Sequence, residues 1–230
     1  MICSGEIISY FDMCIEEGVN LQRGMNFHLG VNYSVILMSE QPGAPYRDKT
    51  EDDGKTIIYE GHDSPNKKDG PDPKTIDQPM FNPSGTLSQN GLFFEAAKSY
   101  KNDGKTEIVK VYEKIRPGIW IFNGLYRLVD SWLEVINSRK VFKYKLNLIE
   151  DQNNLEEDET IYLDNPRTIP SSVKREVWKR DEGKCVICGN NENLHFDHII
   201  PYSKGGTSLD SRNIQLLCAK HNLQKSDNIE

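Results

Sequence analysis

Residues 185–222 read CVICGNNENLHFDHIIPYSKGGTSLDSRNIQLLCAKHN. Two pairs of metal-ligand residues frame this stretch, Cys185 with Cys188 and Cys218 with His221, and two residues separate the members of each pair. That gap lets both side chains of a pair reach one ion from a tight turn, and Cys3His is a closed coordination set of structural zinc. We therefore expect these four side chains to bind zinc, which would supply much of the folding free energy of a small C-terminal domain.

The residues between the two pairs combine an imidazole, a carboxylate and amides. Asp197 and His198 are adjacent at the end of a strand-like run, and Asn213 and Asn222 follow a loop that contains proline and glycine. A neutral imidazole suits proton removal near pH 7. One carboxylate and one amide oxygen can hold a divalent ion and leave positions for a phosphate and a water. These residue types are ones that metal-dependent hydrolysis of a phosphodiester can use.

Several motifs of this segment together resemble the HNH (ββα-metal) endonuclease family: the CVIC knuckle, DHIIPYSKGGT, RNIQLLC and the closing HN. The resemblance implies that His198 is the general base and that Asn213 orients the loop bearing it. It implies that Asp197 and Asn222 bind a catalytic Mg or Mn ion. The spacing leaves one alternative open, in which His221 binds the catalytic ion and zinc has only three cysteines.

A short helix is predicted at residues 172–180, with Val173, Val177 and Trp178 turned inward. Strand-like pieces are predicted at 185–187 and 194–199, and the second half of 211–225 is predicted to be helical. Basic residues of the first helix and its continuation either contact phosphates or form a solvated helix face, because acidic residues are interleaved with them. These basic residues are Lys174, Arg175, Lys179, Arg180 and Lys184.

Upstream of residue 150, short runs rich in β-branched and aromatic residues predict strands. They lie at 33–38, 56–59, 107–112, 119–122, 126–129 and 141–148, and a helix is predicted at 91–100. Residues 61–91 hold many Gly, Pro, Asp and Asn residues and are predicted to form a long loop. Many short strands with turn signals indicate a β-barrel or sandwich.

Pieces of this N-terminal part resemble, in order, the SRA domain, which flips a modified cytosine out of DNA into a pocket. The pieces are GVNLQRG, YSVILMS, the run from Pro45 to Gly61, Asp77-Gln78, VKVYEKIR and FNGLYRLVDSWLE. The resemblance implies a curved β-barrel with flanking helices, and hence an α+β protein overall. It also implies a pocket in which Tyr46 and Tyr59 sandwich the base and Asp48 accepts from its exocyclic amine. The alternative is that both tyrosines are ordinary strand or turn aromatics.

Residues 151–170 carry one basic and six acidic side chains and end in two prolines. We expect an acidic linker there, between an SRA-like domain at 1–150 and an HNH domain at 171–230. The linker holds much of the net charge of −7, so this charge does not exclude a nucleic-acid ligand. Three of the five cysteines lie in the ligand pairs, which favours a metal site in a reduced compartment over disulfides.

The sequence as a whole predicts a restriction-type DNA endonuclease that flips a modified cytosine and cuts double-stranded DNA at an HNH centre. A homodimer is one route to a double-strand break. No long apolar run predicts a membrane span, and no basic region precedes the apolar N-terminus, so we expect a cytoplasmic protein acting on prokaryotic nucleoid DNA. Alternatives are an N-terminal domain that reads unmodified DNA, another modification or RNA, and a modified-DNA reader without catalysis.

Overall fold

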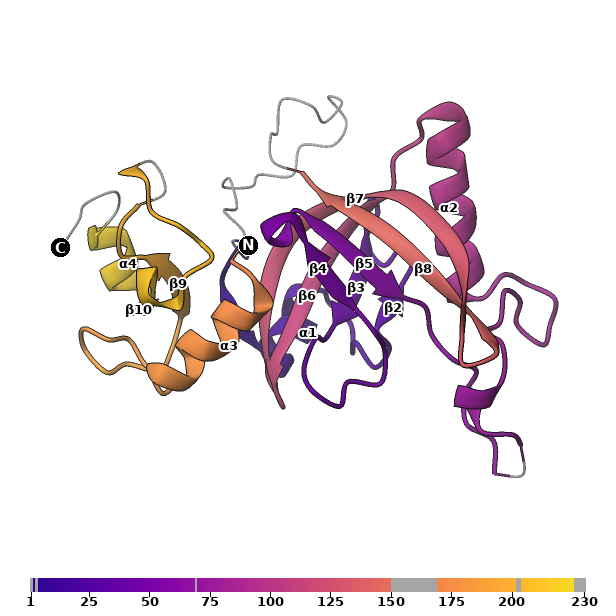
Figure 1. Ribbon diagram of the computed structural model, residues 1–230, viewed down its shortest axis with the longest axis horizontal. Helices are drawn as coiled ribbons and strands as arrows, with labels where there is room; N and C mark the ends of the chain where they lie inside the picture. The colour runs from indigo at the N-terminus through magenta and orange to yellow at the C-terminus, as the bar shows by residue number, and fades with distance from the viewer. Residues whose placement is uncertain (1, 3, 69, 150–168, 202–203, 226–230) are drawn as a thin grey trace.

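The computed structural model describes residues 2, 4–68, 70–149, 169–201 and 204–225 of the 230-residue chain. Figure 1 shows a large curved sheet with helix α2 against it, and a smaller unit of α3, β9, β10 and α4 beside it. The helices are α1 (Tyr10–Glu16), α2 (Gln89–Asp103), α3 (Ser171–Arg180) and α4 (Ala219–Lys225). The strands are β1 (Ile7–Ser9), β2 (Met25–Asn26), β3 (Ser34–Met38), β4 (Lys49–Glu51), β5 (Thr56–Glu60), β6 (Ile108–Arg116), β7 (Ile119–Ile136), β8 (Arg139–Leu148), β9 (Leu194–His198) and β10 (Ile214–Cys218). The expected α+β class is confirmed.

The large sheet has the strand order β2-β3-β6-β7-β8-β5-β4, and β1 pairs with the beginning of β7. Among the described pairs, β3 and β6 run parallel and the others are antiparallel. The sheet curves strongly in Figure 1. No pairing between the described strands joins β2 to β4, so the ladder itself is open at these two edges.

The strand β7 unites two strands that the sequence predicts separately, at 119–122 and 126–129. Asn123 and Gly124 lie between them, and the ladder with β6 shifts register at this point. Gly124 has φ of 111°, a conformation that glycine adopts readily. The Asn-Gly pair, which reads as a turn signal, is therefore a β-bulge within one continuous strand.

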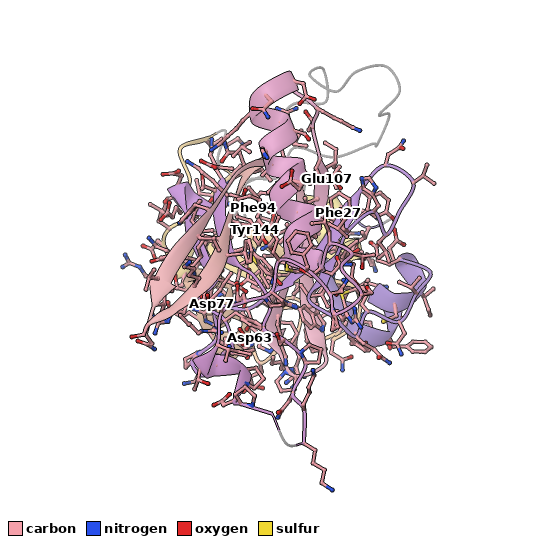
Figure 2. All side chains as sticks on the ribbon, turned by 90° about the vertical axis from the view of Figure 1, so that its right-hand side faces the viewer. Phe27, Asp63, Asp77, Phe94, Glu107 and Tyr144 are labelled. Atoms are coloured by element: carbon pink, nitrogen blue, oxygen red, sulfur yellow. The ribbon has the colours of Figure 1, made fainter. Side chains whose placement is uncertain are left out.

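The other predicted strands of this domain correspond to β3, β5, β6 and β8, and the predicted helix at 91–100 is the middle of α2. Ser88 caps α2 by accepting from the amide of Gly91, and Gly104 ends it with φ of 74°. Phe93 and Ala97 turn their side chains fully into the main core of the sheet. Figure 2 labels Phe94, which belongs to this helix, and Tyr144 of β8, whose hydroxyl donates to the carbonyl of Asn90 in the helix at 2.8 Å. The helix thus closes one side of the sheet.

The long segment between β5 and α2 is tied to the β7–β8 hairpin. Arg139 Nη1 donates to Oδ1 of Asp63 at 2.6 Å, and the amide of Lys140 donates to Oδ1 of Asp77 at 2.7 Å. Figure 2 shows both aspartates in this segment. The segment includes a short 3-10 turn at Pro73–Thr75. Its path is therefore fixed by specific bonds, although its sequence predicts only a loop.

In the smaller unit, β9 and β10 pair antiparallel, with Leu194 opposite Cys218. The predicted strand at 185–187 is wrong, because these residues lie in a turn where the amide of Gly189 donates to the carbonyl of Cys185. Residues three apart in a strand point to opposite faces. A turn instead brings the first cysteine pair to one side, and the predicted helices at 172–180 and in the second half of 211–225 are confirmed.

Across the described ranges, no helix is both long and apolar enough to cross a membrane. The expected linker at 151–170 falls almost wholly outside these ranges, and the domain boundaries stay a prediction. Ile169 and Pro170, at its end, are described, and Ile169 is buried.

Candidate functional site

The four predicted zinc ligands lie together, with their ligand atoms all within 4.8 Å of one another. Nδ1 of His221 is 3.4 Å from Sγ of Cys185 and 3.3 Å from Sγ of Cys218, and the sulfurs of Cys188 and Cys218 are 3.9 Å apart. A tetrahedral ion with Zn–S of about 2.3 Å and Zn–N of about 2.0–2.1 Å needs S···S edges of about 3.8 Å and S···N edges of about 3.5 Å. The cluster therefore fits a metal ion such as zinc.

The sulfur of Cys185 is prepared for a metal by its backbone surroundings. Burial raises the pKa of this thiol, but backbone amides of Cys218, Cys188 and Ile187 and the ring of His221 point at the sulfur and bring the pKa down to about 6. Metal ions bind the thiolate form. The turn thus favours the charge state that coordination requires.

Asp197 and His198 end β9, directly opposite β10. Gln215 is the cross-strand partner of Asp197, and its Nε2 donates to Oδ2 of that carboxylate at 3.1 Å. Nε2 of His198 lies 2.9 Å from Oγ of the buried Ser208. Strand pairing fixes the backbone of both residues, and these polar contacts orient their side chains.

Asn213 is buried and binds the loop after β9 on two sides. Its Oδ1 accepts from the amide of Ile200 at 2.8 Å, while Nδ2 donates to the carbonyls of Ile200 and Thr207. A Cβ on Gly206 would lie 1.8 Å from the carbonyl oxygen of Ile200, so a side chain there would force the loop apart. Together these contacts fix Ile200, Gly206 and Thr207 relative to Asn213.

Sequence reasoning missed Lys225, the last residue of α4. Its side chain is 1% exposed, and its Nζ lies 2.9 Å from Oδ2 of Asp197 and 2.7 Å from the carbonyl oxygen of His198. A lysine near a helix C-terminus is usually solvated, so the residue type did not indicate that this side chain would be buried. Its spacing gave one signal, because Asn222 precedes it by three residues and therefore lies on the same helix face.

Helix α4 separates the two metal-related residues predicted on it. Consecutive residues of a helix point about 100° apart. His221 reaches the cysteine cluster, whereas Asn222 shares the face of Lys225, which contacts Asp197. The arrangement suits two separate ions, and oxygen donors from Asp197 and Asn222 suit Mg or Mn.

The large sheet holds a cavity of about 470 Å³ near the end of β3. Tyr46 and Asp48 line it, as the sequence predicts for a base pocket, together with Arg23 and Lys114. Tyr59 does not line it: this side chain is fully buried, and its hydroxyl donates to backbone carbonyls of the core. His62 lines the cavity instead, a residue that the sequence analysis did not single out.

The carboxylate of Asp48 is held by two backbone amides. Oδ2 accepts from the amide of Ser39 at 3.0 Å, and Oδ1 accepts from the amide of Glu60 at 3.1 Å. Burial raises the pKa of Asp48 to about 7, although both amides act to lower it. The group is therefore fixed in direction, and its protonation changes near neutral pH.

The rings of Tyr46 and His62 are stacked, with centroids 4.7 Å apart and planes 7° apart. Nε2 of His62 is 2.9 Å from the hydroxyl of Tyr59, and Nζ of Lys74 lies 4.2 Å from the ring centroid of Tyr46. Burial and nearby cations lower the pKa of His62 to about 4, so its imidazole is neutral at pH 7. The ring of Tyr46 is thus in contact with two other side chains, His62 and Lys74.

Comparisons with known structures find similar chains for about two thirds of the sequence and for nearly all of it. The SUVH5 SRA domain in complex with hemimethylated CG DNA is 20% identical, with a TM-score of 0.46, over 67% of this chain and 93% of that one. KRYPTONITE in complex with mCHH DNA, a histone H3 peptide and SAH is 20% identical, with a TM-score of 0.45, over 69% of this chain and 34% of that one. No curated protein sequence matches this chain.

The phosphorothioation-dependent Type IV restriction endonuclease ScoMcrA is 16% identical, with a TM-score of 0.43. The match covers 98% of this chain and 57% of that protein. The model of the HNH endonuclease family matches residues 185–228, the segment that contains the cysteine cluster and the Asp197-His198 pair. This chain therefore carries an HNH endonuclease domain at residues 185–228 and is a metal-dependent nuclease.

Proposed function

We propose that this chain is a modification-dependent DNA endonuclease. Its N-terminal domain would bind a flipped, modified cytosine in the cavity beside Asp48, and its HNH domain would hydrolyse phosphodiester bonds of the same double-stranded DNA. The observation that carries the proposal is the combination, in one chain, of a nuclease domain with a cavity whose wall presents a carboxylate fixed by two amides. The cavity volume of about 470 Å³ falls within the range of about 300–1,000 Å³ for ligand pockets.

In the nuclease step, His198 takes the proton from the attacking water, and Ser208 orients its imidazole from 2.9 Å. Asp197 and Asn222 would hold a Mg or Mn ion, whose role is to stabilise charge at the scissile phosphate. Asn213 keeps the loop after His198 in place through its bonds to both sides of that loop. Zinc, held by the three cysteines and His221, would be structural.

In the reading step, a flipped base needs an aromatic face and polar groups along its Watson–Crick edge. Asp48 supplies a fixed carboxyl group, and Tyr46 and His62 supply the rings at the cavity wall. A base between two rings needs about 7 Å, twice a carbon contact distance of about 3.5 Å. The 4.7 Å stack of Tyr46 on His62 must therefore open.

The backbone of His62 is the fixed side of this stack. Its amide donates to Oδ1 of Asn90, and Nδ2 of Asn90 donates back to its carbonyl, both at 2.8 Å. Tyr46 instead follows an exposed loop that includes Pro42 and Gly43. We infer that Tyr46 moves when a base enters, and that His62 takes the part first assigned to Tyr59.

The test is a cleavage assay, with Mg and with Mn, on one plasmid prepared unmodified, 5-methylated or 5-hydroxymethylated at cytosine. We expect cutting of a modified form only, with His198→Ala abolishing cleavage while binding persists. His62→Ala should weaken binding of the modified duplex, whereas Tyr59→Phe should leave binding close to that of the parent.

Equal cutting of all three plasmids would overturn the modified-base proposal and leave an endonuclease that reads unmodified DNA. Loss of binding rather than cleavage in His198→Ala would favour a reader without catalysis. A double-strand break requires two HNH centres or two events, so we propose that two copies act together. A cut rate that rises with the square of protein concentration would support this, and a linear dependence would oppose it. The same proposal places the protein in the cytoplasm of a prokaryotic cell.

A further inference from the structure

The HNH domain is joined to the large sheet by a hydrophobic cluster as well as by the peptide chain. Ile115 of β6 and Ile121 of β7 are buried in one cluster with Val173 and Val177 of α3. The cluster continues into the nuclease unit through Cys185, Leu194, Phe196, Ile214, Leu216, Leu217 and Cys218. Figure 1 shows α3 lying between the sheet and the β9–β10 pair. One core thus serves both domains.

A buried ion pair lies beside this cluster. Nζ of Lys174 in α3 is 3.2 Å from Oε2 of Glu113 in β6, and their side chains are 3% and 0% exposed. Lys174 also donates to Oδ1 of Asn123 at 2.7 Å, and Nδ2 of Asn123 donates to Glu113 at 3.1 Å. Both readings left open for Lys174, a phosphate contact and a solvated helix face, are therefore wrong. Removing one partner of such a pair leaves a buried charge without compensation.

Two further contacts restrain the nuclease unit. Glu6 and His195 form an antiparallel β-bridge, which joins the start of β1 to β9. The guanidinium of Arg116 lies 5.3 Å from the ring centroid of Trp178. The bridge, the aromatic contact and the ion pair join β9 and α3 to Glu6, directly before β1, and to two residues of β6. Rotation of the nuclease unit about any one of these contacts would break the other two.

Strand β6, which contributes Glu113 and Ile115 to this interface, also borders the cavity. Lys114, the residue after Glu113, lines the cavity, and its carbonyl accepts from Nε2 of Gln41, another cavity residue, at 3.1 Å. Two adjacent residues of β6 therefore serve the two sites: Lys114 lines the cavity and Glu113 contacts α3. No hinge separates them in the described structure.

We propose that the reading and cutting domains work as one rigid unit, so that DNA is cut at a fixed offset from the bound base. The packing of α3 against β6 and β7 sets this offset, and the length of segment 150–168 does not. The proposal rests on the proposed function. It differs from a tethered nuclease, whose cut positions would spread as far as the linker allows.

The first test lengthens segment 150–168 by about six Gly/Ser residues, which adds up to about 20 Å of reach. Cut positions are mapped on an end-labelled duplex with one modified cytosine. We expect the cut positions of the parent and the lengthened chain to coincide. Cut sites that move outward by several base pairs would overturn the proposal.

The second test breaks the interface without touching the catalytic residues. Lys174→Met should widen the distribution of cut positions severalfold while binding of the modified duplex is retained. Lys174→Met with Glu113→Gln, which removes both charges, should restore the narrow pattern. Lys179→Met, on the exposed face of the same helix, is the matched control. An unchanged pattern in Lys174→Met would contradict the proposal.

Hydrogen exchange separates failure of this proposal from failure of the proposed function, because it needs no substrate. In a rigid unit, removal of zinc by a chelator should increase exchange of β6 amides near Ile115 as well as of β9 and β10. Lys174→Met should increase exchange of the same β6 amides. Exchange that changes only within residues 185–225 would show two independent domains and overturn the proposal.

Discussion

Nζ of Lys225 bridges Oδ2 of Asp197, at 2.9 Å, and the carbonyl oxygen of His198, at 2.7 Å. One buried ammonium group therefore holds both the carboxylate and the backbone of this dipeptide. The hydrogen bond from Gln215 and the ion pair with Lys225 both end on Oδ2 of Asp197. The geometry leaves Oδ1 as the oxygen that would bind the catalytic ion.

Lys225→Met should weaken binding of the catalytic ion by about 10- to 100-fold, the usual effect of removing a group that orients a metal ligand. The measurement is cleavage rate against Mg concentration: the half-saturating concentration should rise, and excess Mg should recover part of the rate. Lys220→Met, on the exposed side of α4, should change neither. A drop in rate at every Mg concentration, with unchanged half-saturation, would contradict this role.

His221 should belong to zinc and not to the catalytic ion, because its Nδ1 lies 3.3 and 3.4 Å from two cysteine sulfurs. The His221→Ala variant should lose its zinc, and its HNH domain should unfold, whereas the His221→Cys variant should bind zinc and keep the domain folded. Zinc content by atomic emission and unfolding by circular dichroism report the outcome. Cys14→Ser, far from the cluster in sequence, is the control. Retention of zinc in His221→Ala would support the alternative in which zinc has three cysteines.

Asp48 should make stability depend on pH. Burial raises its pKa to about 7 in the folded state, against about 3.9 in an unfolded chain. The contribution of Asp48 to the free energy of unfolding is therefore fully present below about pH 4 and is lost as the pH rises through about 7. Asp48→Asn should remove this component, so that urea unfolding midpoints at pH 5 and pH 8 lie closer together than in the parent. Asp103→Asn, at the exposed end of α2, should leave the difference unchanged.

Two arginine–aspartate ion pairs have the same N···O distance, but we expect loss of the arginine to change the free energy of unfolding by very different amounts in the two. Arg139 and Asp63 are 2.6 Å apart with side chains 6% and 7% exposed, and Arg139→Met should destabilise the fold by about 1–3 kcal/mol, because it removes one of the two cations that contact the buried Asp63, the other being Lys74. Arg212 and Asp210 are also 2.6 Å apart, but Arg212 is 89% exposed. Arg212→Met should have no effect above experimental error in urea unfolding. Similar losses in both variants would show that the Asp63 site is accessible to water.

The cysteine spacing and the strand pattern could be read from sequence because each depends on neighbouring residues. A gap of two residues predicts a shared ion, and runs of β-branched residues predict the main strands of the sheet. The cluster of Cys185, Cys188, Cys218 and His221 and the strands β3, β5, β6 and β8 were predicted in this way.

Residues whose surroundings come from distant parts of the chain could not be placed. Lys174 and Lys225 have the sequence context of solvated helix residues, yet each is buried against a carboxylate from another element. Tyr59 was predicted to line the pocket and is instead fully buried, because an aromatic in a strand gives no sign of which side of a curved sheet it faces. That side is set by the path of the whole sheet.

The continuous strand β7 has a consequence for how proteins of this architecture diversify. It gives Ile121 to the cluster beneath α3 and Leu128 to the core beneath α2. A recombination event within residues 150–168 would take α3 away from the isoleucines and the glutamate that receive it, leaving an apolar face and a buried charge exposed in both products. Gene shuffling at this junction should therefore yield few functional chimaeras. New targets would arise more readily by substitution around the cavity, with the nuclease inherited unchanged.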